Sequence, residues 1–176
     1  MTVRVAINGF GRIGRLALRA ALVDTLSNSW KGTAYEIVQI NEIDGDLESA
    51  AHLLRFDSVH GRFPLDISAN GGLLRVEGNE LNYSNYQSPE DGNWSKLGID
   101  LMIDATGKFK TIPDLKPYYA AGIKKVVVAC PIKDSNALNI VMGINDHLYN
   151  PEKHHLLTAA SCTTNCLAPL IKVIHS

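Results

Sequence analysis

The chain has 176 residues, of which 45% are hydrophobic and 20% charged, and its formal net charge is −1. This composition is typical of one well-cored domain, and it excludes a strongly basic nucleic-acid-binding surface and a disordered charged tail. The apolar runs, such as residues 126–129, are far shorter than the roughly 20 residues that span a bilayer, so we predict no membrane segment. Three cysteines without a secreted framework, and no signal-peptide run, predict a reducing, cytoplasmic setting.

The first elements in chain order are a strand, a helix and a second strand. An apolar run predicts a buried strand at residues 3–7, and apolar side chains at helical spacing predict a helix at residues 12–22. A polar loop around residues 27–33 leads to a β-rich run at residues 35–40. Because such crossovers are right-handed and join parallel strands, the sheet is expected to begin parallel.

The later elements continue this alternation. They are helices at residues 47–54 and 112–121, a hairpin within 71–86, and strands at 99–105, 125–130, 139–142 and 155–159. A last helix begins at Cys162, and Pro169 is expected to weaken or bend it. The sum is an α/β fold of the Rossmann type, with a doubly wound, mostly parallel sheet and an inserted hairpin.

A glycine-rich turn lies between the first strand and the first helix. Residues 8–14 read Asn-Gly-Phe-Gly-Arg-Ile-Gly and fit the G-x-G-x-x-G fingerprint of dinucleotide sites. Gly9 would permit the tight turn, Gly11 the close approach of a pyrophosphate, and Gly14 the packing of helix against strand. The alternative is a glycine-rich turn that binds nothing.

A carboxylate follows the second strand. Glu42 at this point can accept hydrogen bonds from both ribose hydroxyls of an adenosine and repel a 2′-phosphate, which favours NAD over NADP. Its distance from Gly14 exceeds the usual spacing of about 20 residues, and the loop around 27–33 would account for the excess. The alternative is a solvated charge at a strand end.

Cys162 comes just after a strand and at the first turn of a helix. Unpaired N–H groups and the helix dipole favour thiolate over thiol there, so we predict that Cys162 is a nucleophile. Cys166 is deeper in the same helix and is expected to be structural. A zinc site on the two is not predicted, because no paired C-x-x-C or nearby histidine completes a tetrahedral set. The remaining alternative is that Cys162 is a small buried hydrophobe.

Four motifs together resemble the glyceraldehyde-3-phosphate dehydrogenase family. They are Ile-Asn-Gly-Phe-Gly-Arg-Ile-Gly-Arg at 7–15, Phe-Asp-Ser-Val-His-Gly at 56–61, Ala-Thr-Gly at 105–107 and Ala-Ser-Cys-Thr-Thr-Asn-Cys-Leu-Ala-Pro at 160–169. The resemblance runs from end to end, and the last motif is the most specific. Residues 139–149 resemble the branch associated with arsenical-resistance operons.

The resemblance implies NAD-dependent oxidation of glyceraldehyde 3-phosphate. Cys162 would form a thiohemiacetal and then a thioester, which phosphate or arsenate would attack to release an acyl phosphate or acyl arsenate. Ser161 and Thr163 would hold that anion, their alternative role being helix capping. The parent would be a cytoplasmic homotetramer of glucose metabolism or arsenate resistance. The implied cofactor contacts are Asn8, Gly9, Phe10, Gly11, Arg12, Ile13, Gly14, Glu42, Thr106 and Gly107.

The resemblance also implies two domains. Residues 1–160 would form the dinucleotide-binding domain, and 161–176 the nucleophile segment and first helix of a catalytic domain that is otherwise missing. The family's general-base histidine would lie in that missing half, so these 176 residues are expected to bind NAD weakly and catalyse little alone.

The chain departs from the family's pattern in three places. Ala129 stands where the family commonly has serine, so one cofactor hydrogen bond is expected to be lost, and Ser88 stands where the family has an arginine on the adenine side. Glu42 stands where the family has aspartate and is one methylene longer, which should preserve its role. Two other functions stay open: a stand-alone nucleotide-binding or protein-interaction domain, and another sugar-phosphate or semialdehyde dehydrogenase.

Overall fold

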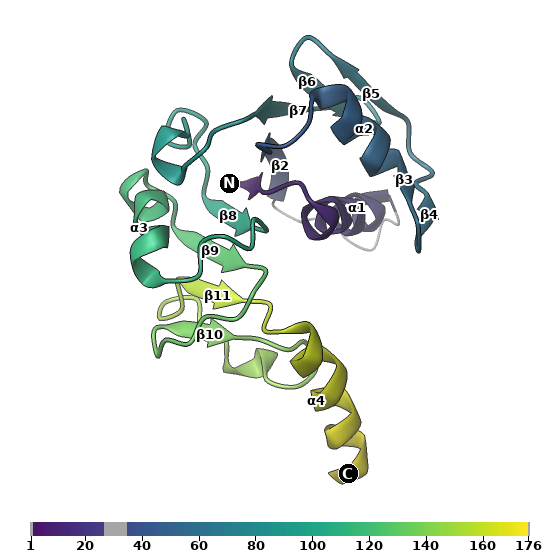
Figure 1. The fold of residues 1–176 in the computed structure, drawn as a ribbon. Helices are drawn as coiled ribbons and strands as arrows, with labels where there is room; N and C mark the ends of the chain where they lie inside the picture. The colour runs from purple at the N-terminus through teal and green to yellow at the C-terminus, as the bar shows by residue number, and fades with distance from the viewer. Residues whose placement is uncertain (1, 27–34, 176) are drawn as a thin grey trace.

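A nine-stranded sheet forms the centre of the computed structural model, which describes residues 2–26 and 35–175 (Figure 1). Its order is β10-β11-β9-β8-β1-β2-β7-β6-β5, and each pairing from β10 to β7 is parallel. The parallel strands are β1 (Val3–Asn8), β2 (Tyr35–Asn41), β7 (Asn79–Ser84), β8 (Leu101–Asp104), β9 (Lys125–Val128), β10 (Ala137–Asn139) and β11 (Leu156–Thr158). The predicted Rossmann-type sheet is confirmed.

The predicted hairpin lies at one edge of this sheet. β6 (Leu73–Val76) pairs antiparallel with β7 and with β5 (Ile67–Asn70), while β7 also pairs in parallel with β2. The hairpin therefore extends the main sheet. Two short strands, β3 (Phe56–Asp57) and β4 (Gly61–Arg62), form a separate small pair.

The strand expected at 139–142 is displaced toward the N-terminus, since β10 ends at Asn139. Asn145 accounts for this end of the strand: its Oδ1 accepts from the Val141 N–H at 2.8 Å, and its Nδ2 donates to the Asn139 carbonyl at 2.9 Å. These local bonds turn the chain out of the sheet and into the 3-10 helix Asp146–Leu148.

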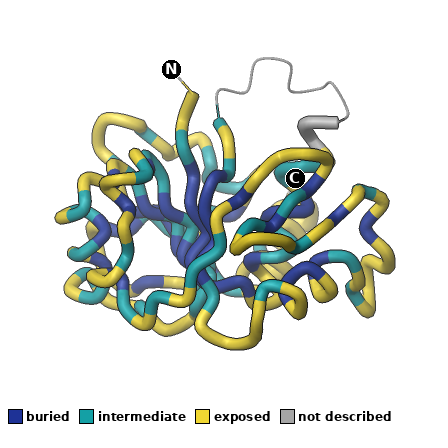
Figure 2. The backbone as a smooth tube through the Cα atoms, turned by 90° about the horizontal axis from the view of Figure 1, so that it is seen from above, coloured by how far each residue is buried: buried dark blue, intermediate teal, exposed yellow. Residues whose placement is uncertain are grey.

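Helices cover both faces of the sheet, and each face has its own hydrophobic core. Helices α1 (Arg12–Leu26) and α2 (Leu47–Arg55) pack on one face, where Leu18 and Leu54 are fully buried. Helix α3 (Ile112–Ala120) packs on the other, with Leu115, Tyr118 and the nearby Trp94 fully buried. Figure 2 shows the buried residues concentrated in the central strands.

Helix α4 (Cys162–His175) extends away from the sheet (Figure 1), unbroken across Pro169, and none of its residues is buried. In the described part of the chain, no helix has both the length and the hydrophobicity needed to span a bilayer. The loop expected around 27–33 lies outside the described residues.

Candidate dinucleotide and thiol site

The glycine-rich turn follows β1 at the point where the strand order reverses. From β1 the chain continues to β2 on one side, and β8 pairs on the other, so the carboxyl end of β1 is the switch point at which α/β sheets bind ligands. Gly9 has a φ of +88°, and a Cβ there would lie 2.6 Å from the Thr106 nitrogen. Only glycine fits this close approach between two loops.

The other two glycines have different surroundings. A Cβ on Gly14 would collide with the Gly9 carbonyl oxygen, so this glycine allows α1 to pack against the turn. A Cβ on Gly11 would meet nothing within 4 Å. Gly11 therefore presents bare backbone to open space, as a backbone that receives a pyrophosphate must.

Glu42 is held by backbone N–H groups at the start of the loop after β2. Its Oε2 accepts from Phe10 N at 2.6 Å, and its Oε1 accepts from Ile43 N at 2.8 Å and Asp44 N at 3.1 Å. The carboxylate is thereby fixed beside the glycine-rich turn. Both lone pairs of Oε1 are engaged by these bonds, whereas Oε2 retains one for a ribose hydroxyl.

A cleft of about 230 Å³ opens between the segments that follow β1, β2, β7 and β8. It contains five of the predicted contacts, namely Asn8, Gly9, Gly11, Glu42 and Thr106. The rest of its lining was not predicted from the sequence: Asn41, Ile43, Asp44, Tyr86, Gln87, Ala105, Lys108 and Phe109. Ile43 is two residues after the end of β2 and Phe109 five residues after the end of β8, so no shared sequence pattern marks these two.

The remaining predicted cofactor contacts do not line this cleft. Phe10 is buried in the core beneath α1 and α2, and it contributes its backbone N–H to Glu42. Ile13 is 57% exposed, and Gly14 lies beneath the turn. Gly107 follows Thr106 with a φ of +65°.

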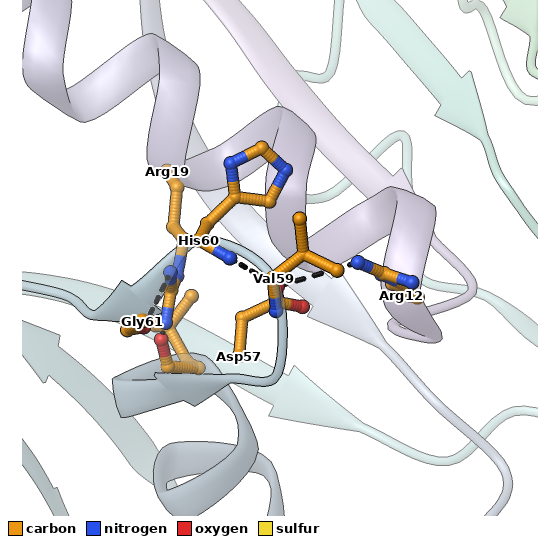
Figure 3. Close-up of polar contacts among 7 residues, drawn as sticks. Arg12, Arg19, Asp57, Val59, His60 and Gly61 are labelled. Atoms are coloured by element: carbon orange, nitrogen blue, oxygen red, sulfur yellow. Dashed lines mark hydrogen bonds and ion pairs between the residues drawn. The ribbon is translucent and has the colours of Figure 1, made fainter.

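Arg12 is tied to the segment that joins β3 and β4 (Figure 3). Asp57 Oδ1 accepts from Val59 N at 2.9 Å and His60 N at 2.8 Å, and the Arg12 guanidinium lies 3.3 Å away. The His60 and Val59 N–H groups, followed by Arg12, lower the pKa of Asp57 to about 2. The motif at 56–61 therefore anchors the first turn of α1, next to the glycine-rich turn.

Cys162 is the first residue of α4 and is exposed. It follows β11 through Ala160, which is buried and has a φ of +55°, a conformation uncommon for a residue with a Cβ. Asn165 Nδ2 donates to the carbonyls of Ala159 at 2.8 Å and Ser161 at 2.9 Å, which holds this turn. Cys166 is exposed too, so the expected structural role has no support here.

Ser161 caps α4. Its Oγ accepts from Thr164 N at 3.0 Å and lies 2.7 Å from Thr164 Oγ1, which is the alternative role that the sequence left open for it. Thr163 is exposed. Ser161 and Thr164 line a second hollow, separate from the cleft, with Lys133, Asn139 and other residues of the segment before α4.

No group of three or more histidine, cysteine, aspartate or glutamate side chains in the described ranges is placed to hold a metal ion.

Comparison with known proteins identifies the family. Residues 3–112 match the model of the glyceraldehyde 3-phosphate dehydrogenase NAD binding domain. The chain is 56% identical over 175 residues to glyceraldehyde-3-phosphate dehydrogenase 3 of Nostoc sp., and 43% identical over 175 residues to the glyceraldehyde-3-phosphate dehydrogenase of Geobacillus stearothermophilus. Each match covers 99% of this chain and 49% of the relative.

The chain belongs to the glyceraldehyde 3-phosphate dehydrogenase family. It spans about half the length of the curated relatives that it matches.

NAD is the cofactor of this family's domain, and the residues of the cleft fit it. The open space at Gly11 suits a pyrophosphate, while Glu42 and Asp44 place negative charge where a 2′-phosphate would have to lie. Ile43 and Phe109 offer apolar contact to a flat ring. The cleft is thus suited to the adenosine half of NAD.

Proposed function

We propose that this chain provides the cofactor cleft and the thiol nucleophile of an enzyme that oxidises glyceraldehyde 3-phosphate with NAD. The proposal concerns a polypeptide of the length of the relatives, of which this chain matches about half. The observation that carries it is the position of Cys162 at the same edge of the sheet as the NAD cleft.

The strand register supports this placement. Asn8 at the end of β1 pairs with Asp104, Asp104 pairs with Val128, and Val128 pairs with Thr158 at the end of β11. The three strand spacings from β1 to β11 give a distance of about 14 Å across the sheet. Cys162 follows Thr158 by four residues. A long dinucleotide with its adenosine at Glu42 can therefore extend along this edge toward the thiol.

Each part of the site has a distinct role. Glu42 would accept hydrogen bonds from the adenosine ribose, and the turn at Gly11 would receive the pyrophosphate. Bound NAD would supply the hydride acceptor. Cys162 Sγ would form a bond to the aldehyde carbon while the carbonyl oxygen gains a proton; on oxidation the carbon would lose its hydride and the oxygen that proton, leaving a thioester. An incoming oxyanion would then attack the same carbon and break its bond to Sγ. The acyl product would leave, and Cys162 would remain as a thiolate.

The oxyanion is proposed to be phosphate or arsenate, held by Ser161 and Thr163 beside Cys162. Both anions are tetrahedral and of similar charge, and the first turn of α4 offers N–H groups to either. Competition between them for product formation would show which one is preferred. We further propose that the parent is a cytoplasmic homotetramer of glucose metabolism or arsenate resistance.

Catalysis by these 176 residues alone is proposed to be slow, because their histidines include none in the position of the family's general base. His175 is the histidine that shares a helix with Cys162, and 13 residues of helix separate the two by about 20 Å. Acylation of Cys162 in a single reaction cycle needs no turnover. Its measurement is therefore a better test of this chain than steady-state activity.

Alkylation by iodoacetamide tests the nucleophile. Cys162 and Cys166 are both exposed on α4, so accessibility does not separate them, but only Cys162 is at the helix start, beside backbone N–H groups that have no partner within the helix. We expect Cys162 to react several-fold faster at neutral pH by peptide mass spectrometry, and to be the residue acylated by glyceraldehyde 3-phosphate and NAD.

The variants Cys166→Ser and Cys162→Ser provide the matched pair. Cys166→Ser should keep the acyl adduct, and Cys162→Ser should lose it. Equal alkylation of the two thiols, or an adduct that survives Cys162→Ser, would contradict the assignment.

A further inference from the structure

A chain of buried side-chain hydrogen bonds crosses the sheet directly beneath the NAD cleft. It joins the ends of β2, β1 and β8 through Asn41, Asn8 and Asp104, and the hydroxyl of Tyr118 on α3 connects the last two. These four residues are at most 4% exposed. Polar groups buried this deeply are costly unless fully bonded, so their arrangement is well determined.

One end of this series of hydrogen bonds holds the segment after β7, which forms one wall of the cleft. Asn41 Oδ1 accepts from Tyr86 N at 2.7 Å, and Asn41 Nδ2 donates to the Tyr86 carbonyl at 3.0 Å. The Asn41 amide thus acts as a strand partner for the segment that carries Tyr86 and Gln87 into the cleft. Asn41 Nδ2 also donates to Asn8 Oδ1 at 2.8 Å.

The other end holds the wall that follows β8. Asp104 Oδ1 accepts from the Thr106 hydroxyl at 2.7 Å and from Thr106 N at 3.1 Å, and Asp104 Oδ2 accepts from the Tyr118 hydroxyl at 2.7 Å. The Asn8 amide donates to the same Tyr118 oxygen. Burial, followed by the charge of Asp104, raises the pKa of Tyr118, so its hydroxyl keeps the proton that it donates.

We infer that the Tyr118 hydroxyl is a positioning group for NAD, because it fixes the glycine-rich turn and the Thr106 turn relative to each other. Asn8 immediately precedes Gly9, whose backbone packs against Thr106. A shift of either turn would change the space into which the pyrophosphate is received. Tyr118 itself does not line the cleft. The inference rests on the proposal that this cleft binds NAD.

Tyr119 offers a matched control. It is the next residue of α3, and its hydroxyl donates to the His155 carbonyl at 3.3 Å, away from the cleft. Tyr119→Phe and Tyr118→Phe each delete one hydroxyl from the same helix. A role confined to folding would make the two variants differ in stability alone.

The experiment measures NAD affinity by calorimetry, well below the unfolding temperature, in the wild-type chain and both variants. Tyr118→Phe should raise the Kd for NAD about ten-fold, since it leaves buried partners unsatisfied at the cleft. Tyr119→Phe should leave the Kd within about two-fold. Asp104→Asn, which replaces one of the two carboxylate acceptors by an N–H donor, should also weaken binding, and it replaces Tyr118→Phe if that variant does not fold.

Amide exchange without NAD provides a second readout. In Tyr118→Phe, the Thr106 amide should exchange at least about ten-fold faster than in Tyr119→Phe, because its acceptor Asp104 has lost an anchor. The Ala159 amide, bonded to the Val128 carbonyl at 2.9 Å, should not change. Equal Kd values and equal Thr106 exchange in the two variants would overturn the inference. A wild-type chain that does not bind NAD would contradict the proposed function, whereas Thr106 exchange would still decide whether Tyr118 fixes the turn.

Discussion

The three glycines of the turn solve three different steric problems at the level of single residues. Gly9 combines a positive φ with contact against Thr106, Gly14 lies against the Gly9 carbonyl, and Gly11 faces open space. The sequence predicts these roles from spacing alone, because the fingerprint encodes one fixed geometry of strand, turn and helix.

The different surroundings of Gly14 and Gly11 predict different effects for a change to alanine at the two positions. Gly14→Ala should lower the free energy of unfolding by more than about 2 kcal/mol, because its Cβ would collide with backbone. Gly11→Ala should change stability by less than about 1 kcal/mol but weaken NAD binding, because its Cβ would occupy the space left for the pyrophosphate. Denaturant unfolding and NAD titration of both variants check this. Equal losses of stability would contradict the assignment.

Asp57 gives a pH-dependent prediction. Its pKa in the folded chain is about 2, below the ordinary value of 3.8, so its carboxylate stabilises the fold above pH 3.8 and loses this effect as the pH falls through about 2. The melting temperature of Asp57→Asn should therefore be below that of the wild type at pH 7, and the difference should shrink toward pH 2. The exposed Glu152→Gln variant is the control. A difference that is constant with pH would show that charge is not the cause.

The sequence predicted Glu42 as a cofactor residue but not its contacts. The bond from Phe10 N to Glu42 depends on how two loops from different strands meet, 32 residues apart in the chain. Ile43 and Phe109 were missed for the same reason, since a single apolar side chain after a strand carries no periodic signal.

Elements with strong periodicity were predicted best. The strands at 3–7 and 35–40 and the helices at 47–54 and 112–121 match β1, β2, α2 and α3 within one residue at either end. The strand at 139–142 was misplaced because its end depends on the side chain of Asn145, not on hydrophobic pattern. The two-residue strands β3 and β4 are too short to produce a pattern.

The cap of α4 allows a prediction at the level of this element. Ser161→Ala should remove the bond to Thr164 N, destabilise the first turn of α4 by about 1 kcal/mol and speed amide exchange at Thr164. Alkylation of Cys162 should slow as the helix start frays. Thr163→Ala, which removes an exposed hydroxyl of the same turn, is the control. Unchanged exchange at Thr164 would show that the cap is not needed.

At the scale of the whole molecule, two hydrophobic cores on opposite faces of one sheet fix the strand order, and that order places the cleft. The fold class could be predicted because the alternation of strands and helices encodes it. The buried series of side-chain hydrogen bonds beneath the cleft could not be predicted, because the bond between Asn8 and Tyr118 joins residues 110 positions apart. Only the folded sheet brings their polar groups together.

Calorimetric titration of NAD and NADP into the chain tests the central claim most directly. Glu42 is held beside the glycine-rich turn, with Asp44 in the same cleft, so a 2′-phosphate beside Glu42 would meet negative charge. We expect NAD to bind at least about ten-fold more tightly than NADP, and Glu42→Gln to reduce this ratio. Equal or tighter binding of NADP, or no binding of either dinucleotide, would contradict the account.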